Sequence, residues 1–263
     1  HREPGEIAWY DFGADVVVES TGQYRDRSDL QKHIDMGADR VVLTTPPRDE
    51  IDDLYIRGVS PEPIDRSHRI WSCGSSTGNC TAAMLGVLDA AFGVRSGFFT
   101  SVHAYTTEQS LIDSPSAVDL RLSRAAIENI VPVQSYTQTL IERAFPKLQG
   151  KFTGNKLNVP VPDASCVDLV TTLDTDVTVT DVNEVFRSAS GSSMRDIVSF
   201  ANEPIVSSDA VGQSASCVFD SLATMVVGDN MVKTLGWYDQ GGGLAHRVCD
   251  LIEKFVPHST SAR

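Results

Sequence analysis

The first part of the chain alternates between short apolar runs and a segment with helical spacing. Residues 14–19 and 40–45 are continuous apolar runs of the kind buried in a parallel sheet. Between them, residues 29–36 carry apolar side chains three and four positions apart and end at Gly37, a residue that suits a helix C-terminus. The pattern predicts a strand, a crossover helix and a second, parallel strand.

The rest of the chain predicts longer elements around one polar segment. A helix is expected from Ser76 or Thr77 to about Phe92, followed by a strand over 98–105. Residues 106–132 are polar and irregular, and a loop of this length usually lines a site or an interface. The other predicted elements are helices over 124–130, 136–145, 181–189 and 244–255, strands over 157–161, 167–173, 216–227 and 231–238, and a flexible glycine hinge over 239–243.

Composition narrows the classes of function. The 263 residues are 41% hydrophobic, enough for one large or two ordinary domains with buried cores. A net charge of −13 without a basic cluster argues against nucleic acid and anionic membranes as partners. The sequence has no run of 18 apolar residues and no signal peptide, so we expect a cytoplasmic protein. Its five cysteines lack a zinc spacing, which predicts reduced thiols and no metal site.

The candidate chemistry lies in two short motifs. The first is Ser75-Ser76-Thr77-Gly78-Asn79-Cys80, and the second is Val102-His103-Ala104. The first resembles the Ser-Cys-Thr-Thr-Asn-Cys signature of phosphorylating glyceraldehyde-3-phosphate dehydrogenases, with Ser76 in place of the reactive cysteine. His103 falls where that family has its general base, and it is expected to exchange protons near neutral pH. Further matches, in order, are residues 15–22, 206–209, 219–220, 237–239 and 247–248.

The resemblance implies a fold of the α/β and α+β classes in three parts. Residues 1–75 are expected to form the second half of a Rossmann-type dinucleotide domain. Residues 76–240 are expected to form a dehydrogenase-type catalytic domain, with a mixed β-sheet and flanking helices. Residues 241–263 are expected to form a C-terminal helix that packs back on the first domain. A homo-oligomer, dimer or tetramer, is also implied.

The resemblance implies only part of a cofactor site. Ser20, Thr21 and Gly22 match the turn that approaches the cofactor, and Gln240 stands where the family has the asparagine that orients the nicotinamide. No Gly-x-Gly-x-x-Gly motif follows an early strand to hold the dinucleotide phosphates. We therefore expect no cofactor, and NAD only if a missing N-terminal half is supplied.

The anion-binding positions of the family are also changed. Asn158 replaces the arginine that clamps the substrate phosphate, and Ser135-Tyr136 replaces the Thr-Gly pair that receives inorganic phosphate. Thr106 and Arg124 match the family's phosphate-binding residues. The cleft is therefore expected to bind a small molecule other than a triose phosphate. The residues predicted to bind it are Ser75, Thr77, Thr106, Arg124, Ser135, Tyr136 and Asn158.

Three functional hypotheses follow. The favoured one is a repurposed, non-redox enzyme that uses His103 as acid or base on a small organic substrate. In it Ser76 is either a partner of His103 or only a helix cap, because serine needs a base to become nucleophilic. The second is an inactivated or truncated form of a true NAD-dependent dehydrogenase, and the third is a non-catalytic scaffold assembled through residues 107–132. Cys73 is a remote candidate for a substitute nucleophile.

Overall fold

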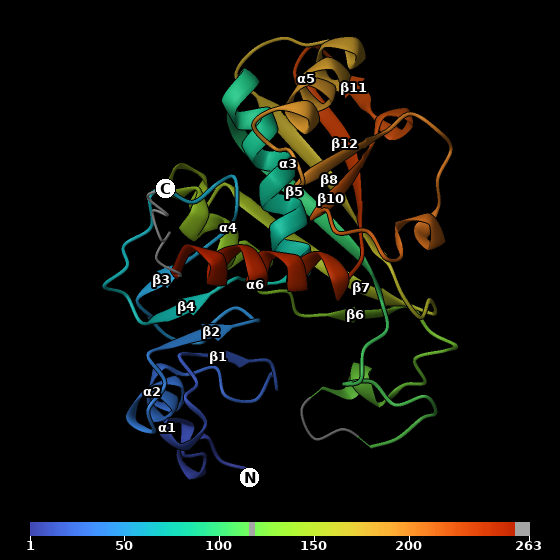
Figure 1. Ribbon diagram of the computed structural model, residues 1–263. Helices are drawn as coiled ribbons and strands as arrows, with labels where there is room; N and C mark the ends of the chain where they lie inside the picture. Colours follow the sequence, from blue (N-terminus) through green and yellow to red (C-terminus); the bar gives the residue numbers. More distant parts are fainter. Residues whose placement is uncertain (116–118, 256–263) are drawn as a thin grey trace. The chain divides into compact units, whose positions relative to one another are not determined.

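The computed structural model describes residues 1–115 and 119–255, which form two compact units. The first unit contains residues 1–75 together with the segment that begins at Leu244, and the second contains residues 76–243. Figure 1 shows the elements of both units in the colours of the sequence.

The first unit is built on a parallel sheet with strand order β1-β2-β4-β3. Because α2 connects β1 to the adjacent parallel β2, the predicted strand–helix–strand crossover is confirmed. The elements of this unit are η1 (Pro4–Glu6), α1 (Trp9–Phe12), β1 (Val16–Glu19), α2 (Arg27–Asp35), β2 (Arg40–Leu43), β3 (Asp53–Leu54), β4 (Ile70–Ser72) and, from Leu244 on, α6 (Gly242–Phe255).

Apolar clusters on both faces of the sheet explain why its central strands are continuous apolar runs. Val41 and Leu43 of β2 belong to a cluster with Leu30 and Ile34 of α2. Val42, which points to the opposite face, belongs to a second cluster that α6 completes. The members of the second cluster are Val42, Tyr55, Trp71, Cys73, Val248, Leu251 and Phe255. A strand that is buried on both faces carries apolar side chains at successive positions, so its sequence does not alternate between apolar and polar residues.

The second unit is built on a mixed eight-stranded sheet with the order β6-β7-β5-β8-β12-β10-β9, to which β11 adds through β12. Its strands are β5 (Val94–Ala104), β6 (Val131–Val133), β7 (Phe152–Val159), β8 (Ser165–Leu173), β9 (Val198–Ala201), β10 (Cys217–Asp220), β11 (Met225–Val227) and β12 (Met231–Tyr238). Its helices are α3 (Ser76–Phe92), α4 (Thr137–Ala144), α5 (Val179–Gly191) and the short η2 (Leu120–Ser123), η3 (Pro146–Leu148), η4 (Ser207–Ala210) and η5 (Ser221–Ala223).

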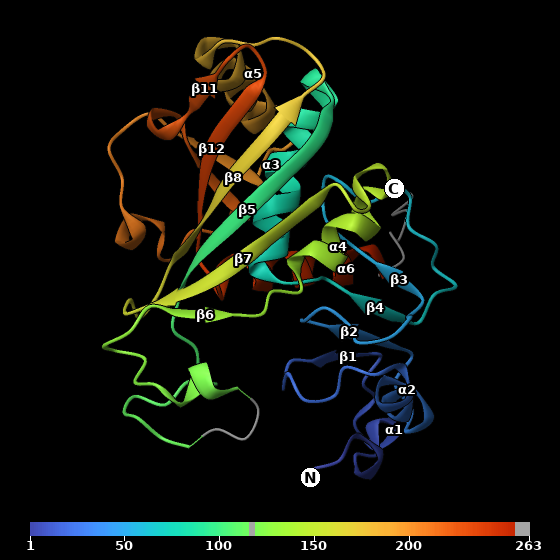
Figure 2. The ribbon, with the colours of Figure 1, turned by 180° about the vertical axis from the view of Figure 1, so that it is seen from behind.

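The long helix α3 lies against one face of this sheet (Figure 1), and the view from behind shows the central strands in front of it (Figure 2). Gly236 of β12 permits this close approach. A Cβ atom at Gly236 would lie 2.6 Å from the sulfur atoms of both Met84 and Cys217, a distance that real Cβ atoms do not reach. Since α3 is buried along most of its length, its first residues are held in a fixed position relative to the sheet.

Two predicted elements differ from the structure. Residues 124–130 form a bend and a turn rather than a helix, while η2 lies just before them. The predicted strand over 216–227 is broken by η5 into β10 and β11, because the side chain of Asp220 accepts a hydrogen bond from the backbone N–H of Leu222 and starts a helical turn. The short strands β6 and β9 were not expected. No helix in the described part of the chain is long and apolar enough to span a membrane.

The predicted glycine hinge is also wrong, because Gly242 already begins α6. The carboxylate of Asp239 accepts hydrogen bonds from the backbone N–H groups of Gly241 at 2.8 Å, Gly242 at 2.6 Å and Gly212 at 2.7 Å. Burial alone would raise the pKa of Asp239, but these three donors lower it below its ordinary value. The backbone N–H groups of these glycines therefore bind an anion, and that anion is the Asp239 carboxylate of the protein itself.

Candidate active site

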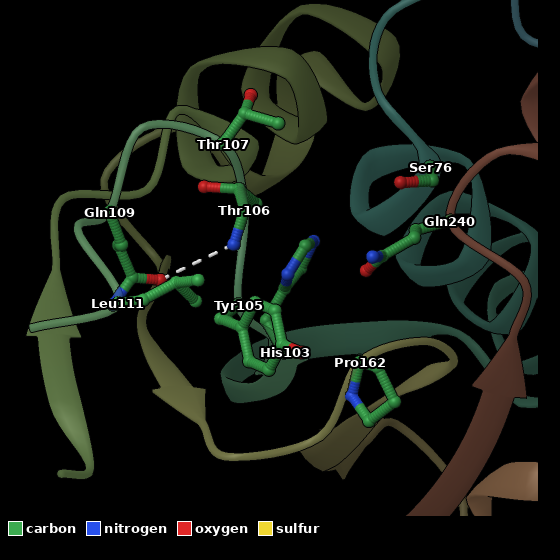
Figure 3. A pocket seen from close by; sticks show the side chains of 9 residues that line it. All are labelled: Ser76, His103, Tyr105, Thr106, Thr107, Gln109, Leu111, Pro162 and Gln240. Atoms are coloured by element: carbon green, nitrogen blue, oxygen red, sulfur yellow. Dashed lines mark hydrogen bonds between the residues drawn. The ribbon is translucent and has the colours of Figure 1, made fainter. Parts of the chain in front are cut away.

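A cleft of about 700 Å³ opens in the second unit beside the carboxyl end of β5 (Figure 3). Most of its wall comes from places where regular elements begin or end: the start of α3, the end of β5, the loop after β5, the loop between β7 and β8, and the residue pair after β12. The lining residues are Ser76, His103, Tyr105, Thr106, Thr107, Gln109, Leu111, Pro162 and Gln240. None of these residues carries a carboxylate or an ammonium group.

His103 is the one titratable base in this lining, and its tautomer is set by the backbone. Its Nδ1 atom lies 2.6 Å from the carbonyl oxygen of Ala104, which can only accept a hydrogen bond. Nδ1 therefore carries the proton, and Nε2 is left with a lone pair. His103 is buried, with a relative exposure of 7%, and its ring makes an edge-on contact with the ring of Tyr238, with centroids 6.2 Å apart.

The surroundings of His103 favour the neutral ring. Burial is the larger cause and the positive charge of Lys156 the second, and together they lower the pKa of His103 to about 4, against a smaller opposite effect of the hydrogen bond to Ala104. The expectation of proton exchange near neutral pH is therefore wrong for the unliganded protein. At pH 7 the imidazole is a neutral acceptor that is weakly basic.

Ser76 is the first residue of α3, and both interpretations of its hydroxyl require correction. Because Ser76 already has helical conformation, it stands one position inside the helix and not at the cap. Within the described residues its hydroxyl has no hydrogen-bond partner, so it neither caps the helix nor forms a dyad with His103. Figure 3 shows Ser76 on the wall of the cleft, across from the loop that carries Thr106.

Gln240 is held in place by a hydroxyl bridge. The hydroxyl of Ser165 donates to Oε1 of Gln240 at 3.0 Å and accepts the backbone N–H of Ala104 at the same distance. This bridge ties together the end of β5, the start of β8 and Gln240, the second residue after β12. The amide nitrogen of Gln240 is left to face the cleft (Figure 3).

The wall beside β7 is made of buried amides. The amide nitrogen of Asn158, a residue that is 2% exposed, donates to Oε1 of Gln109, and the backbone N–H of Thr106 approaches the same oxygen at 3.4 Å. Three polar atoms of this group are buried without a hydrogen-bond partner in the part of the chain that the structure describes: Oγ1 of Thr106, Nε2 of Gln109 and Oδ1 of Asn158. Buried polar atoms without partners are uncommon and costly, so this wall is chemically incomplete.

Comparison with known proteins identifies the family. Residues 72–240 match the family described as "Glyceraldehyde 3-phosphate dehydrogenase, C-terminal domain". The chain belongs to the glyceraldehyde-3-phosphate dehydrogenase family. It is 41% identical over 251 residues to glyceraldehyde-3-phosphate dehydrogenase 1 of Bacillus cereus, covering 95% of this chain and 75% of that one. It is 42% identical over 252 residues to glyceraldehyde-3-phosphate dehydrogenase 2 of Bacillus subtilis, with 95% and 74% covered.

Three residues that the family resemblance assigned to substrate binding lie outside the cleft lining. The hydroxyl of Thr77 is buried against the Tyr238 hydroxyl at 2.6 Å, so it serves the packing of α3 on β12. The guanidinium of Arg124 pairs with the carboxylate of Asp113 at 3.3 Å. Ser75 precedes α3 and belongs to the first unit.

The predicted phosphate-pair residues also lie outside the lining. The hydroxyl of Ser135 accepts the backbone N–H of Thr137 at 3.3 Å, in the turn that starts α4. Tyr136 is the residue before α4 and is 47% exposed, so it does not fill a closed pocket. Of the predicted substrate-binding residues, Thr106 lines the cleft and Asn158 lies directly behind Gln109.

The predicted cofactor turn of the first unit is tied to a buried network. The backbone N–H of Thr21 donates to the carboxylate of Glu19 at 2.8 Å, and so does its hydroxyl at 2.5 Å. The same carboxylate lies 3.3 Å from Nε2 of His33, whose Nδ1 accepts the indole N–H of Trp9 at 3.1 Å. Ser20 and Gly22 flank Thr21, and Gly22 has a φ of 74°, which favours glycine.

Two residues matched to the family's cofactor contacts are engaged by other side chains of the protein: the Thr21 hydroxyl is bonded to Glu19, and Oε1 of Gln240 is bonded to Ser165. The cleft itself offers proton-transfer and hydrogen-bonding chemistry, from the neutral His103, the Ser76 hydroxyl and the amides.

The cysteines do not supply the missing thiol. None of the five forms a disulfide, and none lines the cleft. Burial, helped by the negative charge of Asp250, raises the pKa of Cys73 to about 12, which excludes a nucleophilic thiolate there. His246 and Cys249, which lie three residues apart on α6, are both exposed. The described residues contain no group of three or more side chains suited to hold a metal ion.

The sequence analysis missed Gln109 and Lys156. Gln109 follows Thr106 by three residues in a tight turn, in which its backbone N–H donates to the Thr106 carbonyl at 3.0 Å. Lys156 precedes Asn158 by two residues, so strand alternation places both on one face of β7. The sequence would have shown this alternation if the predicted strand over 157–161 had been extended back to Phe152, where β7 begins.

Proposed function

We propose that the cleft is a proton-transfer site in which neutral His103 acts through Nε2 on a small organic substrate, without a covalent thiol intermediate. The observation that carries this proposal is the hydrogen bond from Nδ1 to the Ala104 carbonyl, which leaves the basic nitrogen unused. A general base must be unprotonated and within reach of the proton that it removes. Nε2 meets the first condition at neutral pH, because the pKa of His103 is about 4.

The weak basicity of the free site limits which substrates suit it. A base with a pKa near 4 removes a proton effectively only if the substrate, once bound, raises that pKa or stabilises the charge that develops. A negatively charged substrate does the former, since it offsets the field of Lys156. The proposal therefore favours a mildly anionic substrate over a neutral one.

Loss of phosphorylating dehydrogenase activity is the second part of the proposal. The similar proteins carry the name glyceraldehyde-3-phosphate dehydrogenase, and the family's chemistry passes through a cysteine thiolate. Here a hydroxyl stands at that position, without a base hydrogen-bonded to it. Asn158 in place of an arginine also removes the guanidinium that would clamp a phosphate. Both changes weaken the phosphorylating dehydrogenase reaction, and neither removes the basic nitrogen of His103.

A specific observation favours one alternative, a true NAD-dependent dehydrogenase with an altered nucleophile. Identity of 39% over 251 residues to the Geobacillus stearothermophilus enzyme, covering 95% of this chain, extends through both units. The Ser76→Cys variant separates the two functions. NAD reduction with glyceraldehyde 3-phosphate and phosphate by this variant would support the alternative, whereas we expect none.

Assembly and location are proposed on separate observations. The described part of the loop after β5 exposes a group of large apolar side chains, which favours a homo-oligomeric contact, dimer or tetramer. These are Leu111, Ile112, Leu120, Ile127 and Ile130. Cysteines without disulfides suit a reducing compartment such as the cytoplasm. Light scattering at micromolar concentration tests the assembly, and a monomer would contradict it.

Deuterium incorporation tests the proton-transfer proposal. Small hydroxy acids, oxo acids and aldehydes are incubated with the protein in D2O, and exchange of C–H groups is followed by proton NMR. We expect His103→Gln to abolish any exchange that the protein catalyses and Ser76→Ala to reduce it by about tenfold or less, since that hydroxyl has no bonded base. Ser135→Ala, outside the cleft lining, is the matched control. Undiminished exchange in His103→Gln, or an acyl group trapped on Ser76, would contradict the proposal.

A further inference from the structure

Lys156 is a half-buried cation beside the cleft that lacks a counterion. Its position on β7 pairs with Ser101 of β5, just as Asn158 pairs with His103, so Lys156 and Asn158 follow each other along one face. Among the described residues its ammonium has neither a hydrogen bond nor an ion pair. Burial lowers the pKa of Lys156, and the negative charge of Glu108 acts in the opposite direction. Burying a charge without a partner costs free energy. An anion that pairs with the ammonium of Lys156 removes this cost and therefore binds more tightly.

The amide wall supplies a second, independent observation. Gln109 is only 7% exposed and lines the cleft, yet its Nε2 has no partner among residues 1–115 and 119–255, and Oδ1 of the neighbouring Asn158 has none there either. Exchanging the oxygen and nitrogen of both amides would still leave one donor and one acceptor unused. The contact from the backbone N–H of Thr106 to Oε1 of Gln109 supports the assignment in the structure. A ligand that completes this wall has to accept one hydrogen bond and donate another.

The charges around the cleft select among anions. The lining residues are uncharged, and Lys156 is the charged residue whose field reaches His103. One positive charge balances a singly charged carboxylate but not a phosphate dianion. Inorganic phosphate at pH 8 is the dianion HPO4 2−, which has one O–H to donate, but its second negative charge is left unbalanced by the single ammonium of Lys156. A carboxylate with a neighbouring hydroxyl satisfies the donor, the acceptor and the charge together.

We propose that Lys156, Gln109 and Asn158 form a binding site for a small hydroxycarboxylate. The carboxylate pairs with the ammonium of Lys156 and accepts from Nε2 of Gln109, while the hydroxyl donates to Oδ1 of Asn158. In this structure both amide atoms, Nε2 of Gln109 and Oδ1 of Asn158, are covered by the protein. The Gln109 side chain, which forms part of the cleft wall (Figure 3), therefore has to rotate when the ligand enters. The site deepens the proposed function, since the register of β5 and β7 puts such a ligand next to His103.

The test compares three probes by calorimetry and by NMR of the His103 ring: glycolate, acetate and inorganic phosphate. We expect glycolate to bind about threefold to tenfold more tightly than acetate, because one hydrogen bond to the amide oxygen is worth roughly 0.5–1.5 kcal/mol. Phosphate at pH 8 is expected to bind more weakly than glycolate. Phosphate binding as tight as that of glycolate would overturn the hydroxycarboxylate in favour of a general anion site.

Variants separate the role of Lys156 from general charge. Lys156→Met should weaken glycolate at least tenfold, and Lys156→Arg should retain most of the affinity. Lys151→Met makes the same change of net charge at an exposed position and should bind glycolate as the parent does. Glycolate binding that is equal in the Lys156→Met and Lys151→Met variants would refute the site, provided that circular dichroism shows both to be folded.

His103→Gln distinguishes failure of this site from failure of the proposed function. Because His103 is not one of the three ligating residues, its replacement should change the calorimetric affinity for glycolate by no more than about threefold. Binding without catalysis in the parent protein would leave the site standing and overturn the proposed proton transfer. Absence of glycolate binding at 50 mM, on the order of the weakest affinity expected for so small a ligand, would overturn the site itself.

Discussion

Replacing His103 with glutamine should remove a pH dependence from the stability of the second unit. In the folded protein the pKa of His103 is about 4, mainly because the ring is buried, whereas the ordinary value is 6.5. Between these values the unfolded chain binds a proton that the folded chain does not. Stability therefore falls as the pH drops from about 6.5 to about 4, and His103 causes no loss above this window.

The size of the effect follows from the two pKa values. Each pH unit within the window costs about 1.4 kcal/mol, so the full loss attributable to His103 is about 3 kcal/mol. Between pH 7 and pH 5 the loss is about 2 kcal/mol, and below pH 4 it no longer grows. Because the imidazole is buried, solvent screening reduces this value little.

Urea unfolding followed by tryptophan fluorescence at pH 7, 6 and 5 measures the effect. Glutamine at this site changes the absolute stability at every pH, so the measured quantity is the difference between pH 7 and pH 5. We expect that difference to be about 2 kcal/mol smaller in His103→Gln than in the parent. His246→Gln, an exposed position on α6, is the matched control for loss of an imidazole.

Direct titration of the ring provides the decisive check. A long-range proton–nitrogen NMR spectrum reports both the tautomer and the pKa of His103. A ring that titrates near 6.5, or one whose proton sits on Nε2 at pH 7, would refute the reasoning from burial and from the Ala104 hydrogen bond.

Three further predictions concern the framework of the cleft. Phe186→Ala should lower the free energy of unfolding by about 3–5 kcal/mol in urea titrations, because the ring is fully buried and stacks on Phe219 at 3.7 Å. Asp239→Ala should cost about 1–3 kcal/mol and increase amide hydrogen exchange at the start of α6, since three backbone N–H groups lose their acceptor. Gly154→Ala should lower the melting temperature markedly, because the new Cβ would collide with the backbone oxygen and ring of Phe99, whereas Gly191→Ala meets no atom within 4 Å.

The sequence by itself determined the family, the order of most elements and two of the residues that line the cleft. The apolar runs at 14–19 and 40–45 specified a buried parallel sheet because such strands have no solvent face, and the structure confirms that pairing. The spacing from Ser76 to His103 placed both at element ends, and both line the cleft. These inferences rest on local patterns and on motifs, whose residues lie close together in the sequence and can be recognised without the fold.

Tertiary structure alone decided the chemistry that these residues can perform. The pKa of His103 depends on burial and on Lys156, a residue of another strand, so no local pattern could have shown that the ring is neutral. The glycines at 241 and 242 were interpreted as a hinge because their partner, the carboxylate of Asp239, becomes an acceptor only when the chain folds back on it. Hydroxyls and charges acquire their roles from neighbours that are distant in sequence, and packing is what brings those neighbours together.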